Sequence, residues 1–251
     1  MIHLATREQS IASRRLSGAG TDQEHWRTDF LVPSTKSISA DVFDPQAFLI
    51  EMTPGEVIQP HFHEVEQFQV FVQGSGQMGR HHNISKPVVV HYTDQYTGYG
   101  PITASPTGFT YFALRPRHDP GAIYLHKPGY RERLRPSKKL HFEIEVALST
   151  DAVLSSRTDP ELESLLTDEK HITHDGLSAS IMRLGPDQSA MLPDPSGTGG
   201  QYLVLVNGAA LIDGITTDIW TVGFTAPTEA PANIKAGQSG AEILVLSFRK
   251  Q

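Results

Sequence analysis

Two histidines separated by a single residue are the feature of this 251-residue chain that points most directly to chemistry. His61 and His63 lie in a short β-like run, and side chains two positions apart on a strand point to the same face. Two imidazoles that converge in this way, with a third donor from the next strand of a hairpin, suit a divalent metal. The spacing therefore predicts a polar or metal-holding site inside a β structure.

Gln67 is expected to begin the next strand and to supply the third donor. Its neutral carbonyl oxygen is a weaker metal ligand than a carboxylate. Alternation places Gln69 and Gln73 on the same face as Gln67, so this interior is expected to be unusually polar. Two alternatives stay open: a metal held by these histidines with Gln67 and solvent, or a metal-free pocket.

The string 55–74 resembles the first sequence motif of the cupins: a glycine, five residues, His-x-His, three or four residues, a glutamate, six residues and a glycine. Every spacing fits, and Gln67 stands in place of the glutamate. The string 100–115 is similar to the second cupin motif, with Tyr111 in place of its histidine and Arg115 in place of its asparagine. A tyrosine hydroxyl ionises near pH ~10, so Tyr111 is expected to act catalytically by donating a hydrogen bond to substrate or water.

A weak internal repeat extends this resemblance to the second half of the chain. Gly55, Gln67 and Gly74 recur as Gly185, Gln201 and Gly208, and residues 108–114 match 240–246. The resemblance implies an all-β fold of two cupin barrels in tandem, each a double-stranded β-helix or jelly roll. The second copy is expected to be degenerate. The positions that match metal ligands there are Met191, Pro193 and Ile243, so those side chains are expected to hold no metal.

Four segments are expected along the chain: an N-terminal arm at 1–39, a cupin domain with the motif residues at 40–126, a connection at 127–176 and the degenerate cupin domain at 177–251. Glycine and proline punctuate short β-like runs throughout. One short helix is expected in the connection. A capping residue at Thr158, Pro160 early in the first turn and leucines on one face predict that it runs to about Lys170.

Other side chains are alternatives for the site. His81 and His82 follow on the next hairpin, where at most one can point inward, and His91 lies in an aromatic-rich stretch. Glu64 or Glu66 replaces the missing carboxylate if the hairpin register slips by one residue, because such a slip reverses the face of every side chain. Solvated positions are the preferred interpretation of His81, His82 and both glutamates.

Composition excludes several classes of protein. The chain has no cysteine, which excludes thiolate metal sites, disulfide scaffolds and cysteine nucleophiles. Its 21 basic and 28 acidic side chains give a net charge of −7, which opposes nucleic-acid binding. No apolar run suits a membrane span, and the first residues lack the apolar core of a secretory signal, so a cytoplasmic protein is expected.

The resemblance to cupins implies a small-molecule substrate or ligand and a site inside the barrel. A dioxygenase-like enzyme with a divalent metal is the first hypothesis, with Fe(II) expected ahead of Mn, Ni or Zn. The second is a metal-free cupin that binds a polar small molecule in a pocket lined by Gln67, Gln69, Gln73 and Tyr111. The third is an isomerase or lyase with a histidine base and Tyr111 as the acid. A homodimer is expected by analogy.

Overall fold

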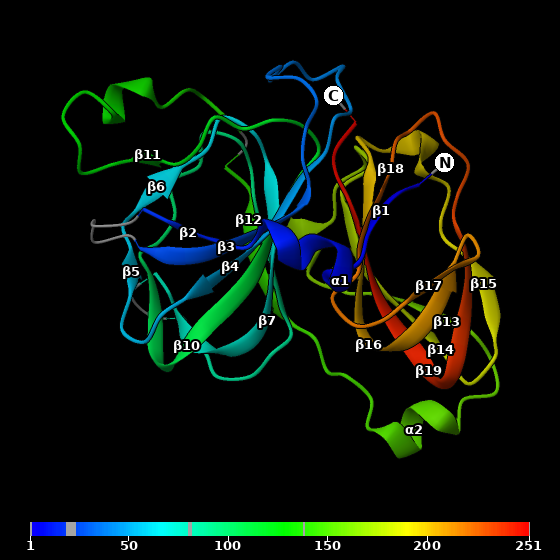
Figure 1. Ribbon diagram of the computed structural model, residues 1–251. Helices are drawn as coiled ribbons and strands as arrows, with labels where there is room; N and C mark the ends of the chain where they lie inside the picture. Colours follow the sequence, from blue (N-terminus) through cyan, green and yellow to red (C-terminus); the bar gives the residue numbers. More distant parts are fainter. Residues whose placement is uncertain (1, 19–23, 80–81, 138, 251) are drawn as a thin grey trace. The chain divides into compact units, whose positions relative to one another are not determined.

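The computed structural model describes residues 2–18, 24–79, 82–137 and 139–250. The chain folds into two compact units, one formed by Ile11–Val146 and the other by Met1–Ser10 with Ala147–Gln251 (Figure 1). Each unit is built on one large antiparallel sheet. None of the helices in the described residues is long and apolar enough to cross a membrane.

The first unit contains a nine-stranded sheet and a separate two-stranded one. The order along the large sheet is β12 (His141–Glu145), β9 (Val89–Thr93), β7 (Gln67–Met78), β10 (Ile102–Arg115), β4 (Gln46–Met52), β3 (His25–Leu31) and β2 (Arg15–Ser17). In addition, β5 (Val57–Ile58) pairs with β10, and β8 (His82–Ile84) pairs with β7. The small sheet joins β6 (His61–Phe62) to β11 (Ile123–Tyr124). Phe48, Phe71 and Tyr111 pack together in the core of this unit.

The second unit contains an eight-stranded sheet. Its order is β1 (His3–Ala5), β18 (Val222–Thr225), β16 (Gln201–Ile212), β19 (Asn233–Ser247), β14 (Ser178–Leu184) and β13 (Glu161–Ser164), with β15 (Ser189–Met191) on β19 and β17 (Ile215–Thr217) on β16. Its core is apolar and includes Leu203, Leu205, Ile243 and Val245. Ile243 in this core is the residue that matches Tyr111 of the first unit.

The repeat expected from the glycines appears in the geometry of both sheets. In β7, Phe71 opposes Tyr111 and Gln73 opposes Thr110, so Val72 is an unpaired bulge residue. In β16, Leu205 opposes Ile243 and Asn207 opposes Glu242, which leaves Val206 in the same position. These shared irregularities support two copies of one barrel.

The units begin and end at other residues than the expected segments. The N-terminal residues do not form one arm, because β1 pairs with β18 in the second unit, whereas β2 and β3 extend the first sheet next to β4 (Figure 1). Within the expected connection, β12 pairs with β9 of the first unit. Both segments thus contribute strands to the sheets. Pairing of this kind satisfies backbone N–H and C=O groups that would otherwise have no hydrogen-bond partner at the edge of a sheet.

The expected helix from Thr158 to Lys170 is wrong. The short helix of this region is α2 (Asp151–Ser155), capped by Thr150, whose hydroxyl accepts a hydrogen bond from the Val153 amide at 3.4 Å. Residues 161–164 instead form β13, paired with β14. Sheet pairing outweighs the weak helical pattern there. The other helical segments are α1 (Arg7–Ser10) and the 3-10 turns Ile11–Ser13, Arg131–Arg133, Glu169–His171 and Pro195–Gly197.

Candidate functional site

The two motif histidines lie at the same end of the first barrel, with ring centroids 5.2 Å apart. His61 is fixed by backbone pairing with Tyr99 and by its Nδ1, which lies 2.7 Å from the Gln59 carbonyl oxygen. The Nδ1 of His63 lies 2.7 Å from a carboxylate oxygen of Asp119. In both rings Nδ1 therefore donates its proton to an oxygen, which leaves Nε2 as the acceptor edge.

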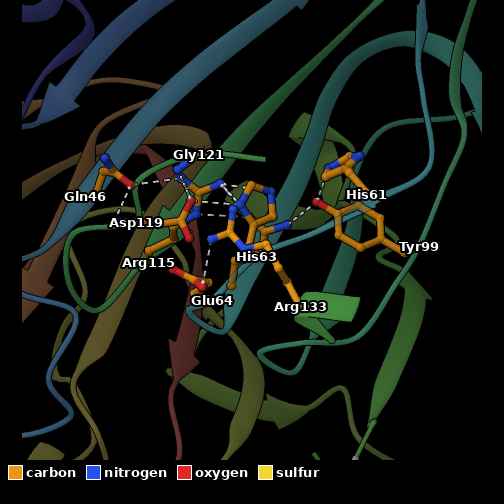
Figure 2. Close-up of polar contacts among 10 residues, drawn as sticks. Gln46, His61, His63, Glu64, Tyr99, Arg115, Asp119, Gly121 and Arg133 are labelled. Carbon is orange, nitrogen blue, oxygen red and sulfur yellow. Dashed lines mark hydrogen bonds and ion pairs between the residues drawn. The ribbon is translucent and has the colours of Figure 1, made fainter. Parts of the chain in front are cut away.

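Arg115, the last residue of β10, connects the polar side chains of this site (Figure 2). Its Nε and Nη2 donate to the Gln67 carbonyl oxygen at 3.1 and 2.9 Å. Its Nη1 donates to Gln46 at 2.8 Å and lies 3.4 Å from the Asp119 carboxylate. Its Nη2 is also 3.3 Å from each ring nitrogen of His63. Since Arg115 is only 4% exposed, this is a buried and extensively hydrogen-bonded cation.

Tyr99 completes the network on the side of His61. Its hydroxyl lies 2.8 Å from His61 Nε2 and accepts a hydrogen bond from the amide nitrogen of Gln67. Figure 2 shows the His61–Tyr99 pair beside the cluster of Arg115, Asp119 and His63. Gln67 thus bridges the two groups, with its nitrogen toward Tyr99 and its oxygen toward Arg115.

A cavity of about 360 Å³ opens beside these residues. Two cationic side chains, Arg27 and Arg115, lie over the Phe48 ring in its wall, at 3.6 and 5.2 Å from the ring centroid. Asp119 is the acidic side chain among the described lining residues. The wall is formed by Ser17, His25, Arg27, Gln46, Phe48, Ile50, Ile58, His61, His63, Gln67, Gln69, Tyr99, Tyr111, Ala113, Arg115, His118, Asp119, Pro120, Gly121, Ala122 and Tyr124.

Burial and charge set the protonation states of the site. Burial, with a smaller effect of His63, lowers the pKa of His61 to about 3. Burial and the Arg115 charge also lower the pKa of His63, against an opposing effect of Asp119. The Asp119 pKa stays well below its usual range because Arg115 and His63 outweigh the effect of burial. Both imidazoles are therefore neutral and Asp119 is ionised near neutral pH.

The four residues expected at the site all line this cavity: His61, His63, Gln67 and Tyr111. Tyr111 is buried, and burial raises its pKa well above the usual value, so its hydroxyl keeps its proton. The expectation for Gln73 is wrong. Its side chain is exposed, because the bulge at Val72 reverses the alternation of β7 beyond Phe71.

The alternative site residues lie elsewhere, as far as the structure describes them. His91 is buried next to the site and its Nδ1 lies 2.8 Å from the Gln69 oxygen, but it does not line the cavity. His82 faces Glu143 at 3.0 Å, and His81 lies outside the described residues. Glu64 binds Arg133 at 3.1 Å, and Glu66 accepts a hydrogen bond from Tyr92 at 2.7 Å. Neither glutamate replaces the missing carboxylate.

The second unit has no counterpart of this polar site among its described residues at the matching positions. Met191 is 60% exposed, and Ile243 is fully buried in the apolar core. Gln201 occupies the position of Gln67, but Ser247 occupies the position of Arg115. At the positions that match the site, the second barrel therefore lacks the charged network of the first, among the residues that the structure describes.

Tyr99, Asp119 and Arg27 were not expected at the site from the sequence, and Arg115 was identified only as a departure from the second motif. A charged residue at the end of the apolar run 109–114 could have identified Arg115 as an inward-pointing cation. Tyr99 and Asp119 lie in segments between the named strands, and Arg27 lies on the distant strand β3. Neither strand alternation nor motif spacing predicts that these three residues lie at the site.

The donor set does not fit a divalent metal as the side chains lie. Among the described residues, no three histidine, aspartate or glutamate side chains converge as a metal-holding group. Arg115 already occupies the carbonyl oxygen of Gln67 and lies against the ring of His63. A dication and a guanidinium about 5 Å apart repel by about 7 kcal/mol at an effective dielectric constant of about 20. The carboxylate beside the two imidazoles, that of Asp119, already pairs with His63 and Arg115.

Comparisons with known proteins support the fold. No family model and no curated protein matches the chain. Solved structures do match, among them a bacterial pirin, YhhW from Escherichia coli in complex with nickel(II), with 13% identity, a TM-score of 0.57 and full coverage of both chains. Salicylate 1,2-dioxygenase from Pseudaminobacter salicylatoxidans matches with 10% identity and a TM-score of 0.62, over 98% of this chain and 84% of that one.

Bacillus subtilis oxalate decarboxylase, a protein with Mn(II) centres, is a further match. Its identity is 11% and its TM-score 0.59, over 96% of this chain and 76% of that one. The matches extend over both units, so the chain has the two-barrel cupin fold and the expected all-β architecture is confirmed. At these identities the likeness describes the fold, and function has to be argued from the site.

Proposed function

We propose that the cavity of the first cupin barrel binds a small organic anion without a resident metal. The observation behind this proposal is the state of Arg27. Its Nε donates to Asp29 at 2.7 Å, and its guanidinium lies over Phe48. Its two terminal nitrogens have no hydrogen-bond partner among the residues that the structure describes. They are donors available to a carboxylate in the cavity.

Arg115 contributes to this site in a different way. All its N–H groups point toward protein acceptors, on Gln46, Gln67, His63 and Asp119. It therefore adds a fixed positive charge to the wall, while Arg27 supplies the direct contacts. Electrostatic preorganisation of this kind favours an anion because the donors are already oriented before the ligand enters.

The rest of the wall suits a small, partly apolar body. Phe48, Tyr99, Tyr111 and Tyr124 provide ring surfaces, and a volume of about 360 Å³ admits a compact metabolite. Gln69 adds a polar group. Its carbonyl oxygen accepts from His91 at 2.8 Å, so the amide nitrogen is left for the cavity. The ligand class is thus a small carboxylate with an apolar portion.

The experiment is a calorimetric titration with formate, acetate, oxalate and benzoate, at low ionic strength because salt screens the attraction. We expect wild-type protein to bind at least one of them, and Arg27→Met to bind it roughly 10-fold to 100-fold more weakly, as loss of a charge-assisted contact implies. Arg133→Met is the matched control, since Arg133 binds Glu64 outside the cavity. Equal binding by all three proteins, or none by wild type, would contradict the proposal.

A second candidate is proton transfer on the bound anion, favoured by the His63–Asp119 pair at 2.7 Å. Asp119 holds the His63 tautomer and would stabilise the imidazolium that forms when Nε2 takes a proton. Tyr111, which keeps its proton, is the matching acid. Deuterium incorporation into a bound carboxylate in D₂O, followed by NMR, tests this candidate. Incorporation in wild type that is lost in His63→Gln would support it.

The dioxygenase-like hypothesis remains a prediction with separate support. The similar structures include a salicylate dioxygenase and cupins named with nickel(II) and Mn(II), so a divalent metal at His61 and His63 is the alternative that the fold suggests. Oxygen uptake after addition of Fe(II) is the measurement that separates it from the two metal-free candidates.

A further inference from the structure

We infer that Arg115 is a built-in cation that takes the place of the divalent metal, and that residues 67 and 115 together decide whether this barrel holds a metal. The inference is independent of which anion the cavity binds. It starts from the atoms that Arg115 contacts. These are the amide oxygen of Gln67, at the position of the motif glutamate, and the ring of His63, the second motif histidine.

The two histidines keep the hydrogen bonds that suit metal ligands. Metal-bound imidazoles usually donate the second ring nitrogen to a carboxylate or a backbone carbonyl, which fixes the tautomer. His63 donates in this way to Asp119 and His61 to Gln59, both at 2.7 Å. Both imidazoles are therefore held in the tautomer that a metal ligand needs, and each Nε2 is engaged by a protein donor instead, Tyr99 at His61 and Arg115 at His63. The third ligand and the charge balance are what the described part of the chain does not provide.

Gln67 cannot serve as that third ligand while Arg115 is present. A carbonyl oxygen has two lone pairs, and the Gln67 oxygen accepts two hydrogen bonds from Arg115, at 3.1 and 2.9 Å. The amide nitrogen is used as well, because it donates to Tyr99. The guanidinium thus occupies the Gln67 oxygen and lies against the His63 ring, and its charge repels a dication. The remaining acceptor, His61 Nε2, lies 2.8 Å from the Tyr99 hydroxyl.

The second barrel offers an internal comparison. Gln201 lies at the position of Gln67, but the residue at the position of Arg115 is Ser247. The Gln201 nitrogen donates to the Ser247 hydroxyl at 3.3 Å, and the Gln201 oxygen has no hydrogen-bond partner among the described residues. A glutamine at this point therefore leaves a buried acceptor unsatisfied unless a cation reaches it, and Arg115 is the cation that does so in the first barrel.

The test is Co(II) binding, measured by titration calorimetry and by visible d–d absorption on protein freed of metal with a chelator. Six proteins are compared: wild type, Gln67→Glu, and Gln67→Glu with Arg115→Asn, each with His61 intact and with His61→Ala. We expect no His61-dependent Co(II) site in the wild type. Gln67→Glu alone is also expected to lack one, because the introduced carboxylate pairs with Arg115. The double variant is expected to gain a site at least roughly 100-fold stronger than any in wild type.

Two results would overturn the inference. One is Co(II) binding to wild type or to Gln67→Glu that disappears when His61 is replaced by alanine. The other is a double variant that has native circular dichroism and binds no more Co(II) than wild type. If the double variant does not fold, wild type and Gln67→Glu still test the inference, because both proteins keep Arg115. A His61-dependent Co(II) site in either of them would show that Arg115 does not exclude metal. Anion titrations of the wild type are read separately, so failure of the proposed ligand class leaves this result unaffected.

Discussion

Arg115 Nη2 donates to the Gln67 carbonyl oxygen across 2.9 Å, and this bond joins the end of β10 to the start of β7. Both side chains are buried, since Gln67 is fully buried and Arg115 is 4% exposed. The polar end of the barrel is therefore held together by a network in which one guanidinium serves several acceptors.

Replacement of Arg115 by methionine is expected to destabilise the protein by about 3–5 kcal/mol, because it leaves the buried Asp119 carboxylate without its cation. Arg115→Lys should cost less, since it keeps the charge but loses the fork of donors. Urea unfolding followed by circular dichroism measures both. Arg133→Met, which removes an exposed pair with Glu64, should cost less than about 1 kcal/mol. Similar losses for Arg115→Met and Arg133→Met would show that the network does not stabilise the barrel.

Glu56 should make stability fall between weakly acidic and neutral pH. Burial raises its pKa from 4.5 to about 7, against the opposing hydrogen bonds from Thr53. The folded state therefore favours the protonated carboxyl. Its contribution is complete below pH 4.5 and is lost as the pH rises through about 7. Glu56→Gln should gain stability relative to wild type as pH rises from 5 to about 8, in unfolding experiments at each pH. A constant difference across that range would contradict the shift.

His91 should have the opposite effect, at acid pH. Burial, with smaller effects of His141 and His82, lowers its pKa from 6.5 to about 3. Below pH 6.5 the unfolded chain therefore binds a proton at His91 that the folded chain does not bind. The contribution of His91 to the free energy of unfolding is complete above pH 6.5 and is lost as the pH falls toward 3. The slope for one such group approaches about 1.4 kcal/mol per pH unit. His91→Gln should lose less stability than wild type between pH 6.5 and about 4.5. Parallel curves for the two proteins would exclude this role.

The fold could be predicted because its signals are local and periodic. The motif 55–74 fixes a hairpin by glycine spacing, and short apolar runs bounded by turn residues mark strands such as β4 and β14. The expected helix at 158–170 failed because its leucines also suit an edge strand, and pairing with β14 decided between them. Segment boundaries failed where β1 and β12 pair with strands far away in the sequence.

The site could be predicted only in part for the same reason. His61, His63 and Gln67 lie within one motif, so alternation was enough to bring them together. Gln73 was misplaced because nothing in the sequence marks the bulge at Val72. Arg27 reaches the cavity from β3, which is held in place by pairing with β4. Long-range pairing of that kind has no signature in a single sequence.

The two copies also predict matched effects of glycine substitution. Gly74 and Gly208 both have positive φ, and a Cβ at either would lie 2.2 or 2.0 Å from the carbonyl oxygen of Gly108 or Gly240. Gly55 and Gly214 have similar φ values, but nothing lies within 4 Å of their Cβ positions. Alanine at these two control sites should cost about 1–2 kcal/mol, the cost of left-handed backbone.

Alanine at Gly74 or Gly208 must add a backbone clash to that cost. The total should exceed the matched control by at least about 2 kcal/mol, in the range of severe single substitutions. Urea unfolding of Gly74→Ala against Gly55→Ala tests the first barrel, and Gly208→Ala against Gly214→Ala tests the second. Equal costs within either pair would mean that the long strands of that barrel, β7 and β10 or β16 and β19, do not approach each other as closely as in this structure. The two barrels would then not share this close backbone contact.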